Sequence, residues 1–302
     1  LIQLLNICNS FNRGVKYFIL TLLFSTFCYS SQNINSFIEQ SKLYENPYWS
    51  KLLHYRNGES EIDSDNFFIS KDGKTDLKKE LFETINSLKN GENSVLCRFP
   101  LRVEWLKKNI PNLEKEIVVY PCPKLNEYLN AVDAKYVTLV FPTAHINSPA
   151  SMYGHTFLRV SSSEDTPLVS NAINFAAKTD DTNGLIFAYK GLFGEYEGRY
   201  SILPYYEKIK EYNNLEQRDI WEYDLDLTQE EINRLVLHSF ELKDVYSDYF
   251  FFKENCSYNI LWLLEVARDD LDLVSQFSFK TVPLDSIKIL KPYNLIKGTK
   301  FR

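Results

Sequence analysis

The stretch KENCSYNILWLLEV, residues 253–266, places a cysteine between a capping residue and a strongly apolar run. Asparagine is a preferred N-cap residue, so Asn255 predicts that a helix begins at Cys256. The residues that follow are apolar on nearly every side of such a helix, which predicts that it lies in the core of the protein. These apolar residues are Ile260, Leu261, Leu263, Leu264 and Ala267.

The start of a helix is a position that activates a thiol. Backbone N–H groups in the first turn are unpaired and the helix dipole is positive there, so a negative charge is stabilised. Thiols at helix N-termini have pKa values of about 3.5–7.5, against about 8.5 for a free thiol. Cys256 is therefore a candidate nucleophile, and a buried structural cysteine is the alternative. A nucleophilic thiol also needs a base.

The chain has four histidines that could supply this base. His54 and His238 fall within amphipathic helical patterns and are interpreted as packing or surface residues. His155 begins a predicted strand directly after a glycine, where a side chain projects at a strand end, and His145 lies in the preceding loop. A cysteine at a helix start facing a histidine on a sheet is the papain-like arrangement, in which a third polar group orients the histidine.

The third polar residue is expected on the strand next to His155. Residues 155–162 (HTFLRVSS) and 168–177 (LVSNAINFAA) predict two strands of a hairpin. Asn171 and Asn174 are the candidates on the return strand. Asn174 is preferred, because the intervening turn brings it roughly opposite His155.

Two other chemistries use similar residue types. A zinc site built from His145, His155 and Cys256 lacks any CxxC or HxxxH spacing. A serine nucleophile at Ser148 or Ser151 lacks the G-x-S-x-G elbow of serine hydrolases. The sequence therefore favours a cysteine–histidine pair that uses neither a metal nor a cofactor.

The N-terminal residues predict export. Two basic residues precede an apolar run over residues 17–29, which is shorter than the about 20 residues that span a bilayer. This pattern is typical of a secretory signal peptide cleaved near Ser30 or Ser31, and a short membrane anchor is the alternative. Because the sequence begins with Leu and its single methionine is Met152, initiation is expected at Val15, with residues 1–14 read through from upstream.

Charge and cysteine content describe the exported chain further. Without the signal peptide, residues 1–30, the chain has 32 basic and 40 acidic residues, a net charge of −8. An acidic domain argues against nucleic-acid partners and against simple adhesion to anionic lipid head groups. Cys97 and Cys122 lie close in sequence and are expected to form a disulfide in an oxidising compartment. Cys256 then remains as an unpaired thiol, which is either buried or used.

The 302 residues, 44% of them hydrophobic, are enough for a folded α+β protein. Residues 34–130 predict a mostly helical subdomain, because apolar residues recur at helical spacing in SFIEQSKLYENPYWSKLLHYR and DLKKELFETINSLKN. From residues 136–142 (YVTLVFP) onward, runs of β-branched and aromatic residues predict strands. Thr228 and Glu231 form a capping box ahead of another amphipathic helix. A second domain is therefore expected over residues 133–302.

Several separated blocks resemble a known family. In chain order they are FPTAHINSPASMYGHTFLRV, NAINFAA, LFGEYEGRYSILPYYEKIKEY and YFFFKENCSYNILWLLEVARDDLDL, between about residues 135 and 275. They resemble the N-terminal periplasmic domain of the Lnb-type lipoprotein N-acyltransferases. The stretch from about Tyr44 to Pro123, with its CRFP segment, resembles the helical region that often precedes this domain in longer Gram-negative members.

This resemblance implies a fold and a set of site residues. The domain is similar to circularly permuted papain-like folds, the group that includes the NlpC/P60 and lecithin:retinol acyltransferase-like proteins. An antiparallel sheet and a cysteine-bearing helix are therefore expected, with the histidine strand preceding that helix. The resemblance implies Cys256 as the nucleophile, His155 as the general base and Asn174 as the third residue. His145, Asn171 and Asn255 are accessory candidates.

The implied activity is periplasmic acyl transfer from a phospholipid, through a Cys256 thioester, to an amine such as the N-terminus of a lipoprotein. Two alternatives remain. One is a cysteine hydrolase that cleaves an amide or isopeptide bond in peptidoglycan or protein. The other is a non-catalytic domain that binds lipid or lipoprotein. Transferases of this kind carry membrane-embedded sequence after the domain, whereas this sequence stops at YNLIKGTKFR, so either missing C-terminal sequence that mediates membrane association or a different use of the site is expected.

Overall fold

The structure is a computed structural model that describes most of the chain after residue 33. The described residues are 34–143, 154–163, 169–179, 183–210, 219–277 and 280–301. The chain divides into two compact units, of which the first ends at Leu43 and contains helix α2 (Ile34–Ser41). The second unit, Tyr44–Arg302, contains the sheet and the other helices. The predicted signal peptide lies outside the described residues, and the domain boundary expected between residues 130 and 133 stays a prediction.

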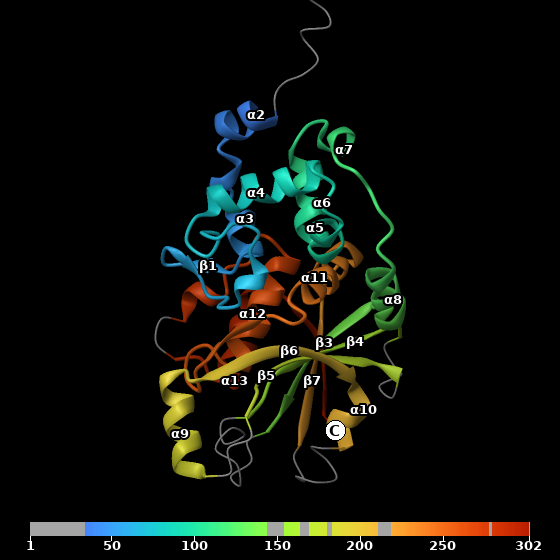
Figure 1. Ribbon diagram of the computed structural model, residues 1–302. Coiled ribbons are helices and arrows are strands. Elements are labelled where there is room, and N and C mark those ends of the chain that lie inside the picture. Colours follow the sequence, from blue (N-terminus) through green and yellow to red (C-terminus); the bar gives the residue numbers. More distant parts are fainter. Residues whose placement is uncertain are drawn as a thin grey trace, which may run out of the picture. The chain divides into compact units, whose positions relative to one another are not determined.

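The first part of the second unit is mostly helical (Figure 1). Its helices are α3 (Pro47–Leu52), α4 (Leu77–Lys89), α5 (Asn93–Arg98), α6 (Pro100–Asn109), α7 (Leu113–Glu116) and α8 (Pro123–Val132), and its short strands are β1 (Tyr55–Arg56) and β2 (Glu59–Ser60). Side-chain oxygens of Asn46 and Asp76 accept backbone hydrogen bonds at the starts of α3 and α4. These caps explain where the two helices begin.

Among the described residues, seven strands form one antiparallel sheet. They are β3 (Tyr136–Pro142), β4 (Phe157–Ser161), β5 (Asn171–Ala177), β6 (Tyr196–Pro204), β7 (Ile220–Leu225), β8 (Tyr246–Tyr249) and β9 (Ile296–Phe301). Their order across the sheet is β8-β6-β5-β4-β3-β7-β9. The mixture of helices with an open antiparallel sheet confirms the predicted α+β class.

Strand β4 begins later than the sequence predicts. His155 was expected to open the strand, but the strand starts at Phe157 and His155 lies just before it. The backbone turns at Gly154, whose φ of 89° is in the left-handed region. The backbone N–H of Thr156 interacts with the Cys256 side chain. The His155 N–H still bonds to the Pro142 carbonyl of β3 at 3.4 Å, so only Thr156 directs its N–H away from the sheet.

The remaining helices connect or cover the strands. They are α9 (Gly184–Phe193), α10 (Tyr205–Ile209), α11 (Gln229–Glu241), α12 (Cys256–Ala267) and α13 (Pro283–Leu290). The predicted capping box at the start of α11 is confirmed, because the Glu231 N–H donates to the Thr228 hydroxyl and the Thr228 N–H donates to the Glu231 carboxylate. Among the described residues, no helix has the length and apolar character needed to cross a membrane.

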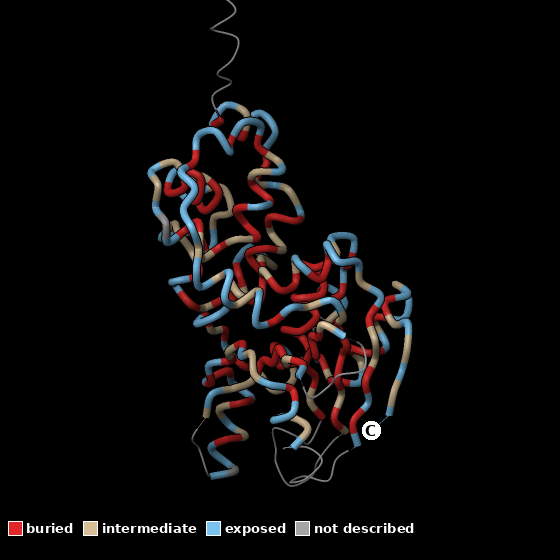
Figure 2. Tube along the Cα trace, turned by 90° about the vertical axis from the view of Figure 1, so that its right-hand side faces the viewer, coloured by how far each residue is buried: buried red, intermediate tan, exposed pale blue. Residues whose placement is uncertain are grey.

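Helix α12 lies at the centre of the core, as the sequence predicts. Every one of its residues is buried, and it packs against β4 and β5 on one side and against α11, α3 and α13 elsewhere. Figure 2 shows buried residues gathered where these helices meet the sheet. The helix that carries Cys256 is therefore held on several sides.

Strands β3 to β8 begin or end at the same end of the sheet, next to His155. The strand pairs Pro142–Ile220, Ala177–Gly198 and Tyr196–Tyr249 show that β3, β5 and β8 end where β6 and β7 begin. Strand β4 also begins at this end, since Phe157 pairs with Val140 near the end of β3. We call it the His155 end of the sheet, because His155 immediately precedes β4.

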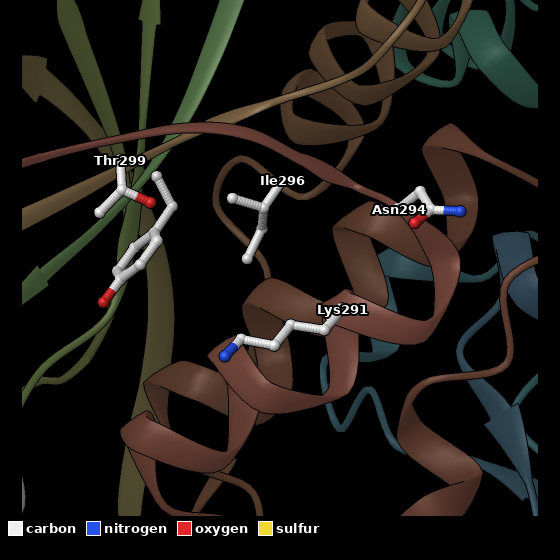
Figure 3. Close-up of a pocket in the computed structure, with 5 residues that line it drawn as sticks. Lys291, Asn294, Ile296 and Thr299 are labelled. Carbon is white, nitrogen blue, oxygen red and sulfur yellow. The ribbon is translucent and has the colours of Figure 1, made fainter.

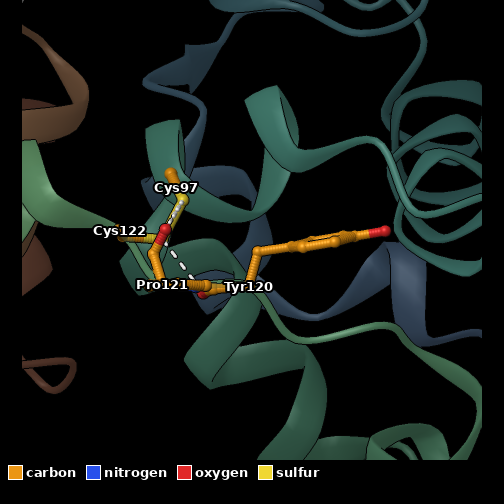
Figure 4. The surroundings of a disulfide bond; sticks show 4 residues. All are labelled: Cys97, Tyr120, Pro121 and Cys122. Atoms are coloured by element: carbon orange, nitrogen blue, oxygen red, sulfur yellow. Dashed lines mark hydrogen bonds between the residues drawn. A yellow bond between two sulfur atoms is a disulfide. The ribbon is translucent and has the colours of Figure 1, made fainter.

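A disulfide joins Cys97 of α5 to Cys122, the residue before α8 (Figure 4). This confirms the pairing predicted from the sequence. The two cysteines are 25 residues apart. A cross-link over a loop of this length is expected to stabilise the fold by about 3 kcal/mol through the unfolded chain. Among the described residues, Cys256 is the free cysteine, and it is buried.

A buried ion pair ties the N-terminal helices together. The Arg102 guanidinium of α6 donates to a Glu80 carboxylate oxygen of α4 at 3.1 Å and to the Phe67 carbonyl at 3.0 Å. Its carbon lies 4.1 Å and 4.2 Å from the ring centroids of Phe67 and Phe99. Glu80 also accepts backbone N–H bonds from residues 69 and 70. Both charged side chains are fully buried, so each depends on the other for its charge to be tolerated.

The two histidines interpreted from the sequence as packing or surface residues prove to be packing residues. His54 and His238 are fully buried, with their Nε2 atoms 2.9 Å apart. His238 Nδ1 lies 2.9 Å from a Glu241 carboxylate oxygen, and the His54 ring stacks on Trp262 of α12 at 4.8 Å. Burial lowers the pKa of His54 and lowers that of His238 to about 3. Both rings are therefore neutral and structural.

Candidate functional site

The loop before Cys256 is held by Asn255, as the sequence predicts for an N-cap. Its side-chain oxygen accepts hydrogen bonds from two backbone N–H groups of the first turn, at 3.1 Å and 3.3 Å. Its side-chain amide donates to the carbonyls of Phe251 at 3.0 Å and Thr281 at 2.7 Å. Asn255 therefore both starts the helix and fixes the segments on either side of the cysteine.

The structure brings Cys256, His155 and Asn174 together. His155 Nε2 lies 2.6 Å from the Asn174 side-chain oxygen, so the ring donates its Nε2 proton there. This leaves Nδ1 as the ring nitrogen available to Cys256, and the two side chains share a hydrogen bond. Asn174 is buried and lies on β5 one residue beyond Ile173, which pairs with Leu158 of β4. The predicted hairpin therefore positions the predicted third residue.

The electrostatics of this cluster favour a charged pair. Burial raises the pKa of the Cys256 thiol, but the charge of His155 and a hydrogen bond from its ring outweigh burial and lower it. Burial lowers the pKa of His155, but the Cys256 thiolate and hydrogen bonds to Cys256 and Asn174 raise it. Each group thus stabilises the charged form of the other, which is the state required of a nucleophilic thiol.

Two further groups surround the sulfur atom. The Thr156 backbone N–H and the Ser257 hydroxyl, whose oxygen is 4.0 Å from Sγ, both interact with it and lower the pKa of Cys256. The Ser257 and Thr156 hydroxyl oxygens lie 3.1 Å apart, within hydrogen-bond distance of each other. Sequence reasoning missed both residues, although each is the direct neighbour of a predicted site residue.

Tyr249, at the end of β8, is a third residue that the sequence did not reveal. Its hydroxyl interacts with the Cys256 side chain and with the Cys256 backbone N–H. Its ring stacks on Phe175 of β5 with centroids 5.9 Å apart. Burial and the Cys256 charge raise the pKa of Tyr249 well above its usual value, so the hydroxyl keeps its proton. A hydrogen-bond donor therefore sits beside the thiol.

The accessory candidates from the sequence have different positions. Asn171 is at the start of β5, and its amide donates to the Ala131 carbonyl at 3.2 Å on the surface. Asn171 is thus not part of the cluster, whereas Asn174 also donates to the Ser201 hydroxyl of β6 at 3.4 Å. His145 lies outside the described residues, as do Ser148 and Ser151.

A metal site is not apparent in the part of the chain that the structure describes. There, no three or more His, Cys, Asp or Glu side chains are grouped as metal ligands would be. The zinc alternative also needs His145, which is outside the described residues.

A cavity of about 290 Å³ lies elsewhere (Figure 3). It is lined by Tyr223 of β7, Lys291, Asn294, and Ile296 and Thr299 of β9. None of these residues belongs to the Cys256 cluster, so the cavity is separate from the candidate site.

Replacing His155 with glutamine is expected to raise the pKa of Cys256. The change removes the positive charge that opposes burial, and burial alone raises the pKa. The thiolate of the unchanged protein should thus appear at a lower pH than that of the variant. Ultraviolet thiolate absorbance measured against pH, with Cys256→Ala as the blank, gives both values and does not require reagent access. Equal midpoints would show that His155 does not activate the thiol.

One known protein family matches a part of the chain that contains the whole candidate site. A family model described as the Lnb N-terminal periplasmic domain matches residues 124–293, a range that includes His155, Asn174 and Cys256. A model described as a domain of unknown function (DUF7843) matches residues 41–109. No match is found among curated proteins or among solved structures.

Proposed function

The chain belongs to the Lnb N-terminal periplasmic domain family, and from this premise we propose that it is a periplasmic thiol acyltransferase. The observation that carries the proposal is the cluster at the start of α12. There a helix N-terminus, an imidazole held by Asn174 and a lowered thiol pKa act on the same sulfur atom. These features are those of an activated cysteine nucleophile.

In the first step the Cys256 thiolate attacks the ester carbonyl carbon of a phospholipid. A carbon–sulfur bond forms, and the carbonyl electrons move onto the oxygen. When the intermediate collapses, the bond to the glycerol oxygen breaks, and the His155 imidazolium gives its proton to that oxygen. The products are an acyl thioester on Cys256, a lysophospholipid and neutral His155.

In the second step an amine takes the acyl chain. The neutral His155 ring accepts a proton from the amine as its nitrogen attacks the thioester carbon. The carbon–sulfur bond then breaks and the thiolate is restored beside the imidazolium. The N-terminal amine of a lipoprotein is the acceptor that this proposal assigns. Asn174 holds the ring in one orientation through both steps, because its side-chain oxygen accepts a hydrogen bond from the Nε2–H group.

Two donors lie beside the sulfur atom. The Cys256 backbone N–H is at the helix start and donates to the Tyr249 hydroxyl, which itself interacts with the Cys256 side chain. A substrate oxygen that enters between them would replace these two contacts and accept from both donors. We assign these two groups as the oxyanion-binding pair.

A hydrolase is the second candidate, and one observation favours it. His155 as a whole residue is only partly buried, and a hydrolase requires that water reach its ring to be activated for attack on an acyl-enzyme. The same cluster would then cleave an amide bond in peptidoglycan or protein. In contrast, the burial of Cys256, which is 4% exposed, favours the non-catalytic alternative.

The deciding experiment is intact-mass measurement after incubation with phosphatidylethanolamine vesicles, wild type beside Cys256→Ala. A fatty-acyl adduct on the wild type alone, removed by hydroxylamine, is expected. Adding a diacylated lipopeptide with a free N-terminal amine should discharge the adduct and yield triacylated peptide. An adduct that discharges to free fatty acid in the presence of the amine would favour the hydrolase. Absence of any adduct, together with an ordinary pKa of Cys256, would reject both enzymatic functions.

A further inference from the structure

Helix α9 exposes an apolar face. Every exposed residue of this helix whose side chain is described is apolar: Leu185, Ile186, Tyr189, Leu192 and Phe193. Leu185 is 84% exposed and Phe193 is 63% exposed. The spacing of the five residues places them along one side of the helix. A contiguous exposed patch of large apolar residues typically marks a surface that contacts a protein, a membrane or a ligand.

The opposite side of α9 is packed against the loop that leads to Cys256. Phe187 is buried and its ring lies 5.1 Å from that of Phe251. The Phe251 N–H donates to the Gly191 carbonyl at 2.8 Å. A Cβ on Gly191 would lie 2.2 Å from the Phe251 ring, so only glycine permits this approach. The inner face of α9 is therefore covered by the Phe251 loop, and the apolar face on the opposite side points to solvent.

A second apolar group is exposed at the same end of the sheet. Trp221, near the start of β7, pairs with Phe301 at the end of β9, and their ring centroids are 4.9 Å apart. Phe301 is 59% exposed and Trp221 is 37% exposed. Since β5 ends and β7 begins at the His155 end, α9 and this aromatic pair both lie there, as Figure 1 shows for α9 and the C-terminus.

We propose that α9 and the Trp221–Phe301 pair form a membrane-binding face that seats the His155 end of the sheet on a phospholipid bilayer. The proposal rests on the proposed function and names where its acyl donor comes from. The exposed side chains would lie among the head groups and upper acyl chains, with α9 parallel to the bilayer plane. Cys256 is at the same end, next to His155, so this face would hold the bilayer on the side of the domain that carries the thiol.

The chemistry of this face favours a bilayer over a protein partner. Helix α9 has no acidic residue, and its single charged residue, Lys190, lies over the Tyr196 ring with its nitrogen 5.6 Å from the centroid. Aromatic residues with one polar atom, such as Tyr189 and Trp221, are typical of membrane interfaces. The two apolar groups are also on separate elements at one end of the sheet, and a bilayer surface can contact both at once. Because apolar insertion drives the contact, a net-negative protein can bind uncharged lipid.

Flotation with phosphatidylcholine vesicles tests this face. The Cys256→Ser protein is used, so that binding is measured without turnover. We expect it to float with the vesicles, and the additional change Leu185→Ser/Phe193→Ser to lower the partition coefficient by about tenfold or more. The matched control is Val118→Ser/Val119→Ser, because these apolar residues are also exposed but lie before α8. Circular dichroism and thermal unfolding confirm that each variant is folded.

Three outcomes would overturn the proposal. The first is that the protein does not float with the vesicles. The second is that both double variants lower the partition coefficient equally. The third is that the protein self-associates in sedimentation and only the α9 change abolishes this. The last result would identify the face as a protein interface. Acylation by a short-chain phospholipid dissolved in water separates this inference from the proposed function. If the α9 variant with Cys256 intact is still acylated, the function stands even where the membrane face fails. If the protein floats with vesicles but is not acylated, the membrane-binding face stands and the proposed function fails.

Discussion

Replacing His155 with glutamine is expected to slow acylation of Cys256 by about 10²–10⁴-fold, the usual contribution of a positioned acid–base group. Two effects combine in this loss. The thiolate is depleted, because burial raises the pKa of Cys256 once the imidazolium is gone. The departing alcohol also loses its proton donor. The rate is measured by intact mass over time under single-turnover conditions with a short-chain phospholipid.

Asn174 and Asn171 provide a matched pair for the same assay. Both are asparagines on β5, but only Asn174 contacts His155, whereas Asn171 bonds to the Ala131 carbonyl on the surface. Asn174→Ala should reduce the rate and raise the pKa of Cys256, since the ring loses its orienting acceptor. Asn171→Ala should leave both unchanged. If the two variants behave alike, Asn174 has no positioning role, and an unimpaired His155→Gln protein would refute the assignment of the base.

Replacing Arg102 with methionine is expected to lower the free energy of unfolding by about 3–5 kcal/mol, the cost of leaving a buried charge without its partner. Glu80 would keep its backbone N–H bonds but lose the guanidinium, and Phe67 and Phe99 would lose a cation between them. Urea unfolding at neutral pH measures the change. A loss of this size is a large part of the stability of an ordinary domain.

The pH dependence of the stability loss and two control variants test whether the unpaired Glu80 carboxylate causes it. Burial raises the pKa of Glu80 and Arg102 opposes this, so removing Arg102 raises the pKa further. A raised carboxyl pKa favours folding at low pH and is unfavourable as pH rises through it, so the defect should shrink on acidification. Glu80→Gln/Arg102→Met should recover part of the loss. Lys79→Met, which breaks the exposed pair with Asp72, should change little. Equal effects of Arg102→Met and Lys79→Met would contradict the argument.

Local sequence signals were sufficient for the elements that carry the site. Asn255 before an apolar run predicted the start and burial of α12, and the hairpin pattern placed Asn174 within reach of His155. The Thr228 capping box and the Cys97–Cys122 disulfide were also predicted correctly. Each of these depends on residues close in sequence or on a simple count, and these are the features that a single sequence records.

Contacts between distant elements were not predictable in the same way. Tyr249 stands in an aromatic run for which no strand was predicted, and only the pairing of β8 with β6 brings its hydroxyl to Cys256. His54 lies 184 residues before His238, so no local pattern linked them. The exposed face of α9 was also hidden, because an apolar segment interrupted by glycine resembles a core element until its packing is known.

The hydrogen bonds of Asn255 bear on the order in which the cysteines of the chain reach their final states during folding. The lowered pKa of Cys256 depends on the His155–Asn174 pair, and the helix start that carries Cys256 depends on the bond from Asn255 to the Thr281 carbonyl. An unfolded chain has none of them in place, so its Cys256 is an ordinary, weakly ionised thiol. Cys97 and Cys122 are only 25 residues apart and meet more readily by chain diffusion. On the proposed function, the fold thereby separates two kinds of sulfur chemistry in time. The Cys97–Cys122 cross-link can form first, and Cys256 gains the partners that lower its pKa only when the surrounding chain has folded.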